Sequence, residues 1–311
     1  NIFEFLEEKE EPENWYPDRV TDDSMNKVKP EMPMLKLDKI EFYYREDKPL
    51  LKDFSVVVEK GESVAITGPS GCGKTTVSKL LLSLYPLLGG EWFLGGSSCY
   101  DLSNNEIRKQ IAYVPQEPYL FNESVRENIR IGKPDATDAE IENAAKLAYA
   151  HDFIMQLEKG YDTNVGERGN NLSGGQKQRV SIAGVLAMHP KCIILDEPTA
   201  MLDPQGRKEV LRAVRALNDV EQVTVILITH YMEEAVYSDR VFVMDHGRIV
   251  LQGTPKEVFS EVEELQKYRL EVPQPTLLAH LLRKEGMKLP SGILTKEELA
   301  DEIIKLYHKK C

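Results

Sequence analysis

The chain has 311 residues, which predicts one large domain with additions or two domains, because single cores stop growing at about 250–300 residues. Apolar residues make up 41% of the chain and charged residues 29%, which excludes a chain that is disordered throughout. The 39 basic and 51 acidic residues give a net charge of −12, which argues against a nucleic-acid partner but not against a small phosphate site.

The first segment, residues 1–33, is acidic and carries several prolines. Such a stretch buries too little apolar surface to join a core, so it predicts a linker or extension. From there to about residue 265, short apolar strands alternate with helical patterns. The segments 192–195 and 225–228 are apolar throughout, and residues 63–67 also form a buried strand pattern. Strands of this kind are typical of a parallel sheet that helices cover on both faces.

Four helix starts are marked by capping boxes, in which a hydroxyl and a carboxylate three residues apart satisfy free backbone N–H groups. Residues 103–106, 137–140 and 295–298 fit this pattern, and residues 254–257 add a proline at the first helical position. Apolar spacing after residue 74 predicts another helix, which we expect to end at Pro86.

The last part of the chain predicts a separate helical unit. Two prolines interrupt the sequence around residues 270–275, and leucine-rich segments follow them. We therefore expect a boundary between about residues 265 and 275 and a small C-terminal helical domain at 270–311.

Residues 68–75 match the pattern G-x-x-x-x-G-K-[ST] and lie between a predicted strand and a predicted helix, as a phosphate-binding loop requires. Glycines let backbone N–H groups surround phosphate oxygens, and the helix N-terminus adds its positive end. We expect Lys74 to reach the β- and γ-phosphates of ATP and Thr75 to hold Mg²⁺. A purely structural glycine-rich turn is the alternative. The predicted nucleotide-binding residues here are Gly68, Ser70, Gly71, Cys72, Gly73, Lys74, Thr75 and Thr76.

Two adjacent acidic residues, Asp196 and Glu197, follow one of the apolar strands. At the carboxyl end of a buried strand, such residues face the ligand crevice of an α/β sheet. We expect Asp196 to contact Mg²⁺ through water and Glu197 to polarise the attacking water. For a lone acidic pair, a solvated strand end would be the default interpretation.

A glycine-rich helix start, residues 172–176 with the sequence Leu-Ser-Gly-Gly-Gln, precedes this acidic pair. Together these motifs resemble ATP-binding-cassette (ABC) ATPases. The resemblance implies that Ser173, Gly174, Gly175 and Gln176 bind the γ-phosphate of the ATP held by a partner subunit. Physically, a hydroxyl and backbone N–H groups at a helix start form an anion-binding cap. An ordinary glycine-rich cap is the alternative.

Three further positions match the family one by one. The resemblance implies that Tyr44 stacks on adenine, that Gln116 senses Mg²⁺ and couples to the membrane partner, and that His230 contacts the γ-phosphate. Each of these residues has a structural alternative: a core tyrosine, a loop glutamine and a structural histidine. Ala200 departs from the family, which usually has serine there, so one hydroxyl is missing from the loop that crosses the dimer interface.

The two halves of the chain resemble different branches of the family. Residues 119–129 and 163–169 are similar to the nucleotide-binding domains of ABC exporters. Residues 179–187, 201–207 and the tail are similar to the ATPase subunits of energy-coupling-factor (ECF) importers, in which the tail forms a helical domain that helps hold the ATPase pair together. The chain is therefore a mosaic, joined near 166–172, and could be a natural, chimeric or designed protein.

The resemblance implies an α/β P-loop ATPase core at 34–265, with an antiparallel β subdomain and a helical subdomain at about 117–187, followed by the C-terminal helical extension. It further implies a Mg²⁺-dependent ATPase that works as a head-to-tail homodimer or heterodimer at the cytoplasmic face of the cell membrane. No apolar run approaches the roughly 18–20 residues of a membrane span, so transmembrane subunits would have to recognise any transported substrate.

Our leading interpretation is an ECF-type importer ATPase. The first alternative is a severed exporter nucleotide-binding domain, which would normally lack residues 270–311. A soluble ABC protein that acts on ribosomes or DNA would usually need tandem cassettes or basic inserts. A catalytically silent scaffold is the remaining alternative, and a phosphate-release assay would separate it from the enzymes.

Overall fold

The computed structural model describes residues 12, 13, 15, 16 and 32–308 of the chain. Most of the predicted acidic extension therefore lies outside the described residues. The part that is described contacts the remainder of the chain. The indole N–H of Trp15 donates to the carbonyl of Ser83 at 2.9 Å, and the backbone N–H of Asn104 donates to the carbonyl of Glu13 at 2.9 Å.

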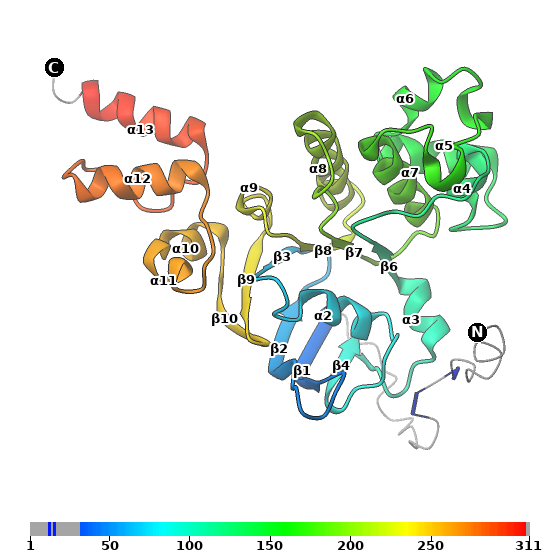
Figure 1. The fold of residues 1–311 in the computed structure, drawn as a ribbon, viewed down its shortest axis with the longest axis horizontal. Coiled ribbons are helices and arrows are strands. Elements are labelled where there is room, and N and C mark those ends of the chain that lie inside the picture. Colours follow the sequence, from blue (N-terminus) through cyan, green and yellow to red (C-terminus); the bar gives the residue numbers. More distant parts are fainter. Residues whose placement is uncertain (1–11, 14, 17–31, 309–311) are drawn as a thin grey trace.

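Two sheets form the centre of the molecule (Figure 1). The smaller sheet is antiparallel and has the order β2-β1-β4-β5. Its strands are β1 (Leu35–Phe42), β2 (Leu51–Val58), β4 (Gly89–Leu94) and β5 (Ser97–Ser98). Buried and exposed positions alternate along much of β1, as expected for a strand with one face on the core.

The larger sheet has the order β10-β9-β3-β8-β7-β6 and is parallel except for β10, which pairs antiparallel with β9 at the edge. Its strands are β3 (Ser63–Thr67), β6 (Ile111–Val114), β7 (Cys192–Asp196), β8 (Thr224–Ile228), β9 (Arg240–Asp245) and β10 (Arg248–Gly253). Every residue of β7 and β8 is buried. The three predicted buried strands are confirmed, and they lie side by side.

Helices fall into three groups around this sheet. Those beside the sheets are α2 (Lys74–Leu81), α3 (Asn104–Gln110), α8 (Pro204–Asp219) and α9 (Met232–Ala235). A second group, hereafter the helical group, comprises α4 (Val125–Arg130), α5 (Asp138–Leu147), α6 (His151–Met155) and α7 (Gly174–Leu186), with the short 3₁₀ turns η2 (Gly160–Asp162) and η3 (Glu167–Gly169). The third comprises α10 (Pro255–Ser260), α11 (Val262–Lys267), α12 (Gln274–Lys284) and α13 (Lys296–His308).

All four predicted capping boxes are present. The predicted end of the helix after residue 74 was wrong, because α2 ends at Leu81 rather than at Pro86. Ser83 adopts a left-handed conformation with φ 55°, which breaks the helix. Side chains from elsewhere satisfy the carbonyls that this break leaves free: Trp15 and Arg108 donate to Ser83, and Arg108 also donates to Leu82.

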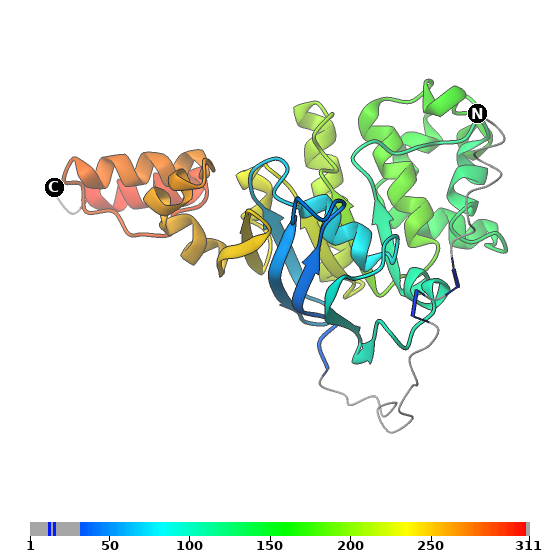
Figure 2. The ribbon, with the colours of Figure 1, turned by 60° about the horizontal axis from the view of Figure 1, so that its bottom comes forward.

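The two faces of the parallel sheet face different cores. Ile194 and Ile226 belong to the core shared with the antiparallel sheet, whereas their neighbours Ile193 and Val225 belong to the core shared with the helical group. The C-terminal helices α12 and α13 enclose a small core of their own. Figure 2 shows this helical tail extending from the molecule on the side opposite the helical group.

This architecture confirms the predicted α/β P-loop fold with its antiparallel and helical parts and its C-terminal extension. Among the described residues, no helix is both long enough and apolar enough to cross a membrane.

Candidate functional site

The predicted phosphate loop connects β3 to the start of α2. Gly73 precedes the helix with φ 112°, a conformation that side chains other than glycine rarely adopt. A Cβ atom at Gly68 would lie 2.2 Å from the carbonyl oxygen of Met244, so the loop could not pass β9 with any larger residue. These two glycines therefore allow the chain to turn tightly from strand into helix.

The side chain of Lys74 is buried beneath this loop. Its ammonium group donates to the carbonyl oxygens of Gly68 at 2.7 Å and Pro69 at 3.0 Å. The positive charge is thereby fixed at the N-terminus of α2, where the helix dipole adds to it. The thiol of Cys72 is also buried, and burial raises its pKa, so it packs as an uncharged side chain and only its backbone serves the loop.

Asp196 lies at the end of β7 and is 4% exposed. Its carboxylate accepts hydrogen bonds from the hydroxyl of Tyr113 at 3.2 Å and from the hydroxyl of Thr75. Burial raises the pKa of Asp196 above its usual value, although the two hydroxyl donors partly oppose this shift. One carboxylate thus links the first turn of α2 to strands β6 and β7.

The next residue, Glu197, adopts φ 48°, and its backbone N–H donates to the carbonyl of Ile228 at 2.8 Å. Its carboxylate oxygen Oε2 lies 3.2 Å from Nδ1 of His230, the second residue after β8. A cavity of about 230 Å³ is lined by Glu197, Leu50 and six of the predicted loop residues, Lys74 and Thr75 among them. The structure therefore brings the loop and Glu197 into one cavity. His230 does not line this cavity but contacts the Glu197 carboxylate.

Tyr44 lies beside the same loop and is 50% exposed. Its hydroxyl is 3.3 Å from the hydroxyl of Thr76, and its ring packs edge-to-face against Phe42 and Tyr85, with centroids 5.0 and 5.3 Å apart. These contacts fix the ring close to the start of α2 while half of its surface stays open. Such a ring can stack on a flat ligand.

The residues of the predicted signature lie elsewhere. Ser173 caps α7, accepting from the N–H of Gln176 at 3.3 Å while its own N–H donates to the Gln176 side chain at 2.9 Å. Ser173 and Gly174 are exposed, and Gly175 is buried where α7 begins, with the Cα of Gly206 3.1 Å from a Cβ built there. None of the four lines the cavity with the loop, and in both views α7 lies within the helical group, away from α2 (Figures 1 and 2).

Gln116 is exposed in the segment that leads from β6 to the helical group, and it does not line the cavity. The adjacent carbonyl of Pro115 accepts from the side chain of Gln178 on α7 at 3.5 Å. This segment therefore connects the sheet to the helix that carries Ser173.

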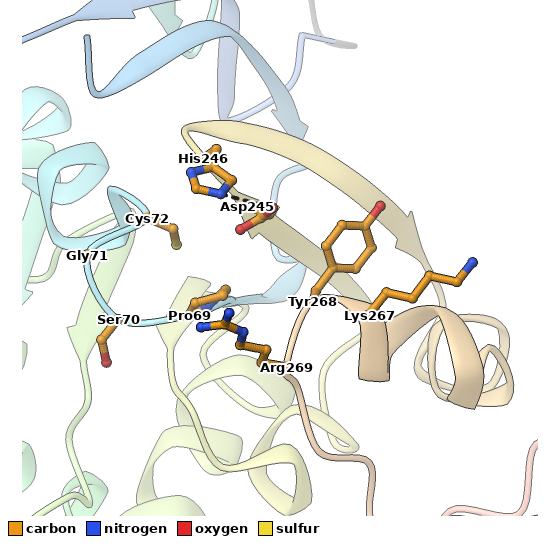
Figure 3. A pocket seen from close by; sticks show the side chains of 9 residues that line it. All are labelled: Pro69, Ser70, Gly71, Cys72, Asp245, His246, Lys267, Tyr268 and Arg269. Carbon is orange, nitrogen blue, oxygen red and sulfur yellow. Dashed lines mark ion pairs between the residues drawn. The ribbon is translucent and has the colours of Figure 1, made fainter. Parts of the chain in front are cut away.

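Two features near the site carry no signal in the sequence. The first is a hollow of about 440 Å³ on the other flank of the loop, where residues 69–72 face Asp245 and His246 at the end of β9, and residues 267–269 at the end of α11 (Figure 3). The second is a buried carboxylate, Glu234, which bonds Thr229, the residue that precedes His230. Both arise from segments far apart in the chain, which no local pattern could bring together.

Comparisons with known proteins now bear on this site. The family described as ABC transporter matches residues 51–200, and the family described as Energy-coupling factor transporter EcfA1 C-terminal domain matches residues 273–310. The ATP-binding protein EcfA1 of the energy-coupling factor transporter from Caldanaerobacter subterraneus is 43% identical over 280 residues, which cover 88% of this chain and 99% of that protein. The chain belongs to the energy-coupling factor transporter ATP-binding proteins. The corresponding protein of Clostridium novyi is 40% identical over 270 residues, which cover 84% of this chain and 92% of that protein.

ABC exporters are also similar to this chain, but only over part of the exporters' own length. A multidrug export ATP-binding/permease protein of Staphylococcus aureus is 41% identical over 226 residues, which cover 72% of this chain and 39% of that one. A solved bacterial Atm1-family ABC exporter with ATP bound has a TM-score of 0.68 and 34% identity, covering 83% of this chain and 43% of that chain. The chain thus spans less than half of each exporter. Both resemblances expected from the sequence are confirmed, and the full-length relatives favour the importer branch over the severed exporter.

Proposed function

We propose that the chain is the ATP-binding and ATP-hydrolysing subunit of an energy-coupling factor importer, with the motif residues in the roles expected from the sequence. The observation that supports this function is that one cavity contains the phosphate loop, Lys74, Thr75 and Glu197. His230 lies beside Glu197. Phosphoryl transfer to water needs a phosphate cradle, a positive charge and a group that orients the water, and this cavity supplies all three.

Hydrolysis would proceed by in-line attack of water on the γ-phosphate of ATP. Glu197 orients and polarises the water, because its carboxylate faces the cavity and its backbone is anchored to β8. His230 holds that carboxylate at 3.2 Å and keeps its own second nitrogen available for the γ-phosphate. Lys74 neutralises the charge that develops on the phosphate oxygens, and Tyr44 holds the adenine.

The residues present fit Mg²⁺. The hydroxyl of Thr75 and the carboxylate of Asp196 are hard oxygen donors, and they already lie within hydrogen-bond distance of each other. Mg²⁺ prefers to take its other ligands from water and phosphate oxygens, which agrees with finding no cluster of three or more ionisable ligands in the described part of the chain. When bound, the ion would neutralise negative charge on the phosphate groups. Gln116, exposed at the loop after β6, would reach it only if that loop moves inward.

We propose that two chains, or one chain and a homologue, complete each ATP site head to tail. The separation of Ser173 and Gly174 from the loop of their own chain supports this arrangement. An exposed hydroxyl and free helix N–H groups are suited to bind the γ-phosphate of ATP held by a partner. The missing hydroxyl at Ala200 would weaken the contact between subunits rather than ATP binding.

We also propose that the subunit acts at the cytoplasmic face of the cell membrane, together with transmembrane transporter subunits, since its full-length relatives are named as transporter ATP-binding proteins. The domain limits we propose are an extension at 1–33, the ATP-binding domain at 34–265 and the C-terminal helical domain at 270–311. Co-purification from membranes tests the partner: recovery with an ECF-type transmembrane subunit is expected, and recovery with an exporter membrane domain alone would contradict it.

The test of the chemistry is Glu197→Gln. The amide keeps the shape of the side chain but no longer accepts a proton from water, so ATP binding should persist while turnover falls by about 100-fold or more. Phosphate release with Mg²⁺ and ATP measures the loss, and a nucleotide-binding titration is the control. Hydrolysis at the wild-type rate would overturn the role of Glu197.

A further inference from the structure

Glu234, on the short helix α9, is a buried carboxylate that the proposed mechanism does not use. It is 2% exposed and lies between two equally buried threonines, Thr199 and Thr229, which are both 0% exposed. One carboxylate oxygen accepts from the hydroxyl of Thr199, and the other accepts from the hydroxyl of Thr229 at 2.7 Å. Taking a carboxylate out of water costs free energy, so a group retained there with two donors calls for an explanation.

The two threonines belong to the segments that carry the catalytic pair. Thr199 is the second residue after Glu197, in the turn where the N–H of Ala200 donates back to the carbonyl of Glu197 at 3.2 Å. Thr229 immediately precedes His230, and its hydroxyl also accepts from the N–H of Tyr231 at 3.0 Å. Glu234 thus connects the segment after β7 to the segment after β8.

A third element packs against this network. The guanidinium of Arg207, on α8, lies 3.9 Å from the ring centroid of Tyr231. Burial raises the pKa of Glu234, and the two threonine hydroxyls and the positive charge of Arg207 partly oppose this shift. The ring of Tyr231 in turn lies against that of His230, with centroids 4.0 Å apart. The backbone of His230 is therefore fixed on one side by Thr229 and on the other by Tyr231, and both residues depend on Glu234 and its neighbours.

We propose that Glu234 is a positioning residue for ATP hydrolysis: by bridging Thr199 and Thr229, its carboxylate holds Glu197 and His230 in the geometry that orients the attacking water. This inference rests on the proposed function. Glu234 does not contact the cavity that holds the phosphate loop, so it acts on the rate of the chemical step and not on nucleotide affinity.

The test compares Glu234→Ala and Glu234→Gln with Glu233→Ala, a matched control that removes the neighbouring exposed carboxylate from the same helix. The full chain is assayed for phosphate release with Mg²⁺ and ATP, in the same assembly that supports wild-type turnover. Glu234→Ala should lower kcat by about 10- to 100-fold with KM for ATP changed less than about 3-fold, because a displacement near 1 Å can cost 100-fold. Glu234→Gln keeps the shape and one acceptor, so it should restore part of the rate.

Wild-type kcat in Glu234→Ala, or a rise in KM with kcat unchanged, would overturn the inference. Should that variant fail to fold, Thr229→Val removes the hydroxyl that bonds both Glu234 and the N–H of Tyr231 while preserving shape, and it must lower kcat relative to Glu233→Ala. The double variant Glu234→Ala with Thr199→Val should lose no more activity than Glu234→Ala alone, since both changes break the same network. If the two losses of activity multiply, Glu234 does not bridge the two threonines. A wild-type chain without hydrolysis would overturn the proposed function and this inference with it, whereas wild-type turnover in Glu234→Ala would overturn only the inference.

Discussion

The two glycine-rich helix starts of this chain, at α2 and at α7, differ in almost every respect except their glycines. The start of α2 lies in a cavity with the buried Lys74 and with Glu197, while Asp196 bonds Thr75 of that cavity and His230 lies 3.2 Å from Glu197. The start of α7 is closed by its own capping box and presents Ser173 and Gly174 to the surface, whereas α2 begins without a side-chain cap. The groups expected to carry the chemistry thus lie at one end of the chain and only a cap lies at the other, which is the division that the proposed head-to-tail pair requires.

The largest expected effect comes from inactivating the two ends separately. Lys74→Ala removes the cation of the α2 end, and Gly174→Asp places a negative charge where we expect a γ-phosphate to bind. Each homodimer should lose ATPase activity by about 100-fold or more. Mixing the two variants should restore about a quarter of the wild-type rate, because half of the dimers are mixed and each contains one intact composite site.

Phosphate release from the two variants, alone and mixed, measures this complementation. Mixing wild-type chain with Lys74→Ala at matched concentration controls for dilution. If the mixture is as inactive as each variant alone, both ends act within one chain, and the composite site is wrong.

An intermediate effect should separate the ends by affinity. Tyr44→Ala removes the half-open ring beside α2, and loss of base stacking costs about 1–3 kcal/mol, so ATP affinity should fall by about 5- to 160-fold. Tyr44→Phe keeps the ring and loses only the contact with Thr76, and should bind nearly as wild type. Gly174→Asp, at the other end, should leave ATP affinity unchanged. Equal losses in a nucleotide titration of Tyr44→Ala and Gly174→Asp would contradict separate roles.

The features that depend on local spacing could be predicted from the sequence, and those that depend on contacts between distant segments could not. The α2 loop, the helix start at Ser173 and the buried strands follow from local spacing, and the structure has them where expected. The shorter α2 was not predictable, because Trp15 and Arg108 supply the donors that cap it from elsewhere in the chain. Glu234 was not predictable either, because its partners Thr199 and Thr229 belong to other segments of the chain.

The smallest expected effect is also the most discriminating, because the two ends should respond with opposite signs. Burial raises the pKa of Asp196 above 3.8, so the folded chain holds that proton more tightly than the unfolded chain does. The stability contributed by this group is therefore complete below pH 3.8 and is lost as the pH rises through the raised pKa. At neutral pH the buried charge destabilises the fold, and Asp196→Asn should increase the free energy of unfolding by up to about 2 kcal/mol while abolishing activity.

Ser173→Ala should do the reverse in stability, since it removes the capping box of α7 and costs about 0.5–2 kcal/mol. Denaturant unfolding at pH 7 and at pH 5 measures both variants. The advantage of Asp196→Asn should shrink as the pH falls toward 3.8, and the cost of Ser173→Ala should not change, because no titrating group makes that cap. If both substitutions destabilise equally at both pH values, Asp196 is not held at a cost to the fold, and the contrast between a strained catalytic end and a relaxed capping end is wrong.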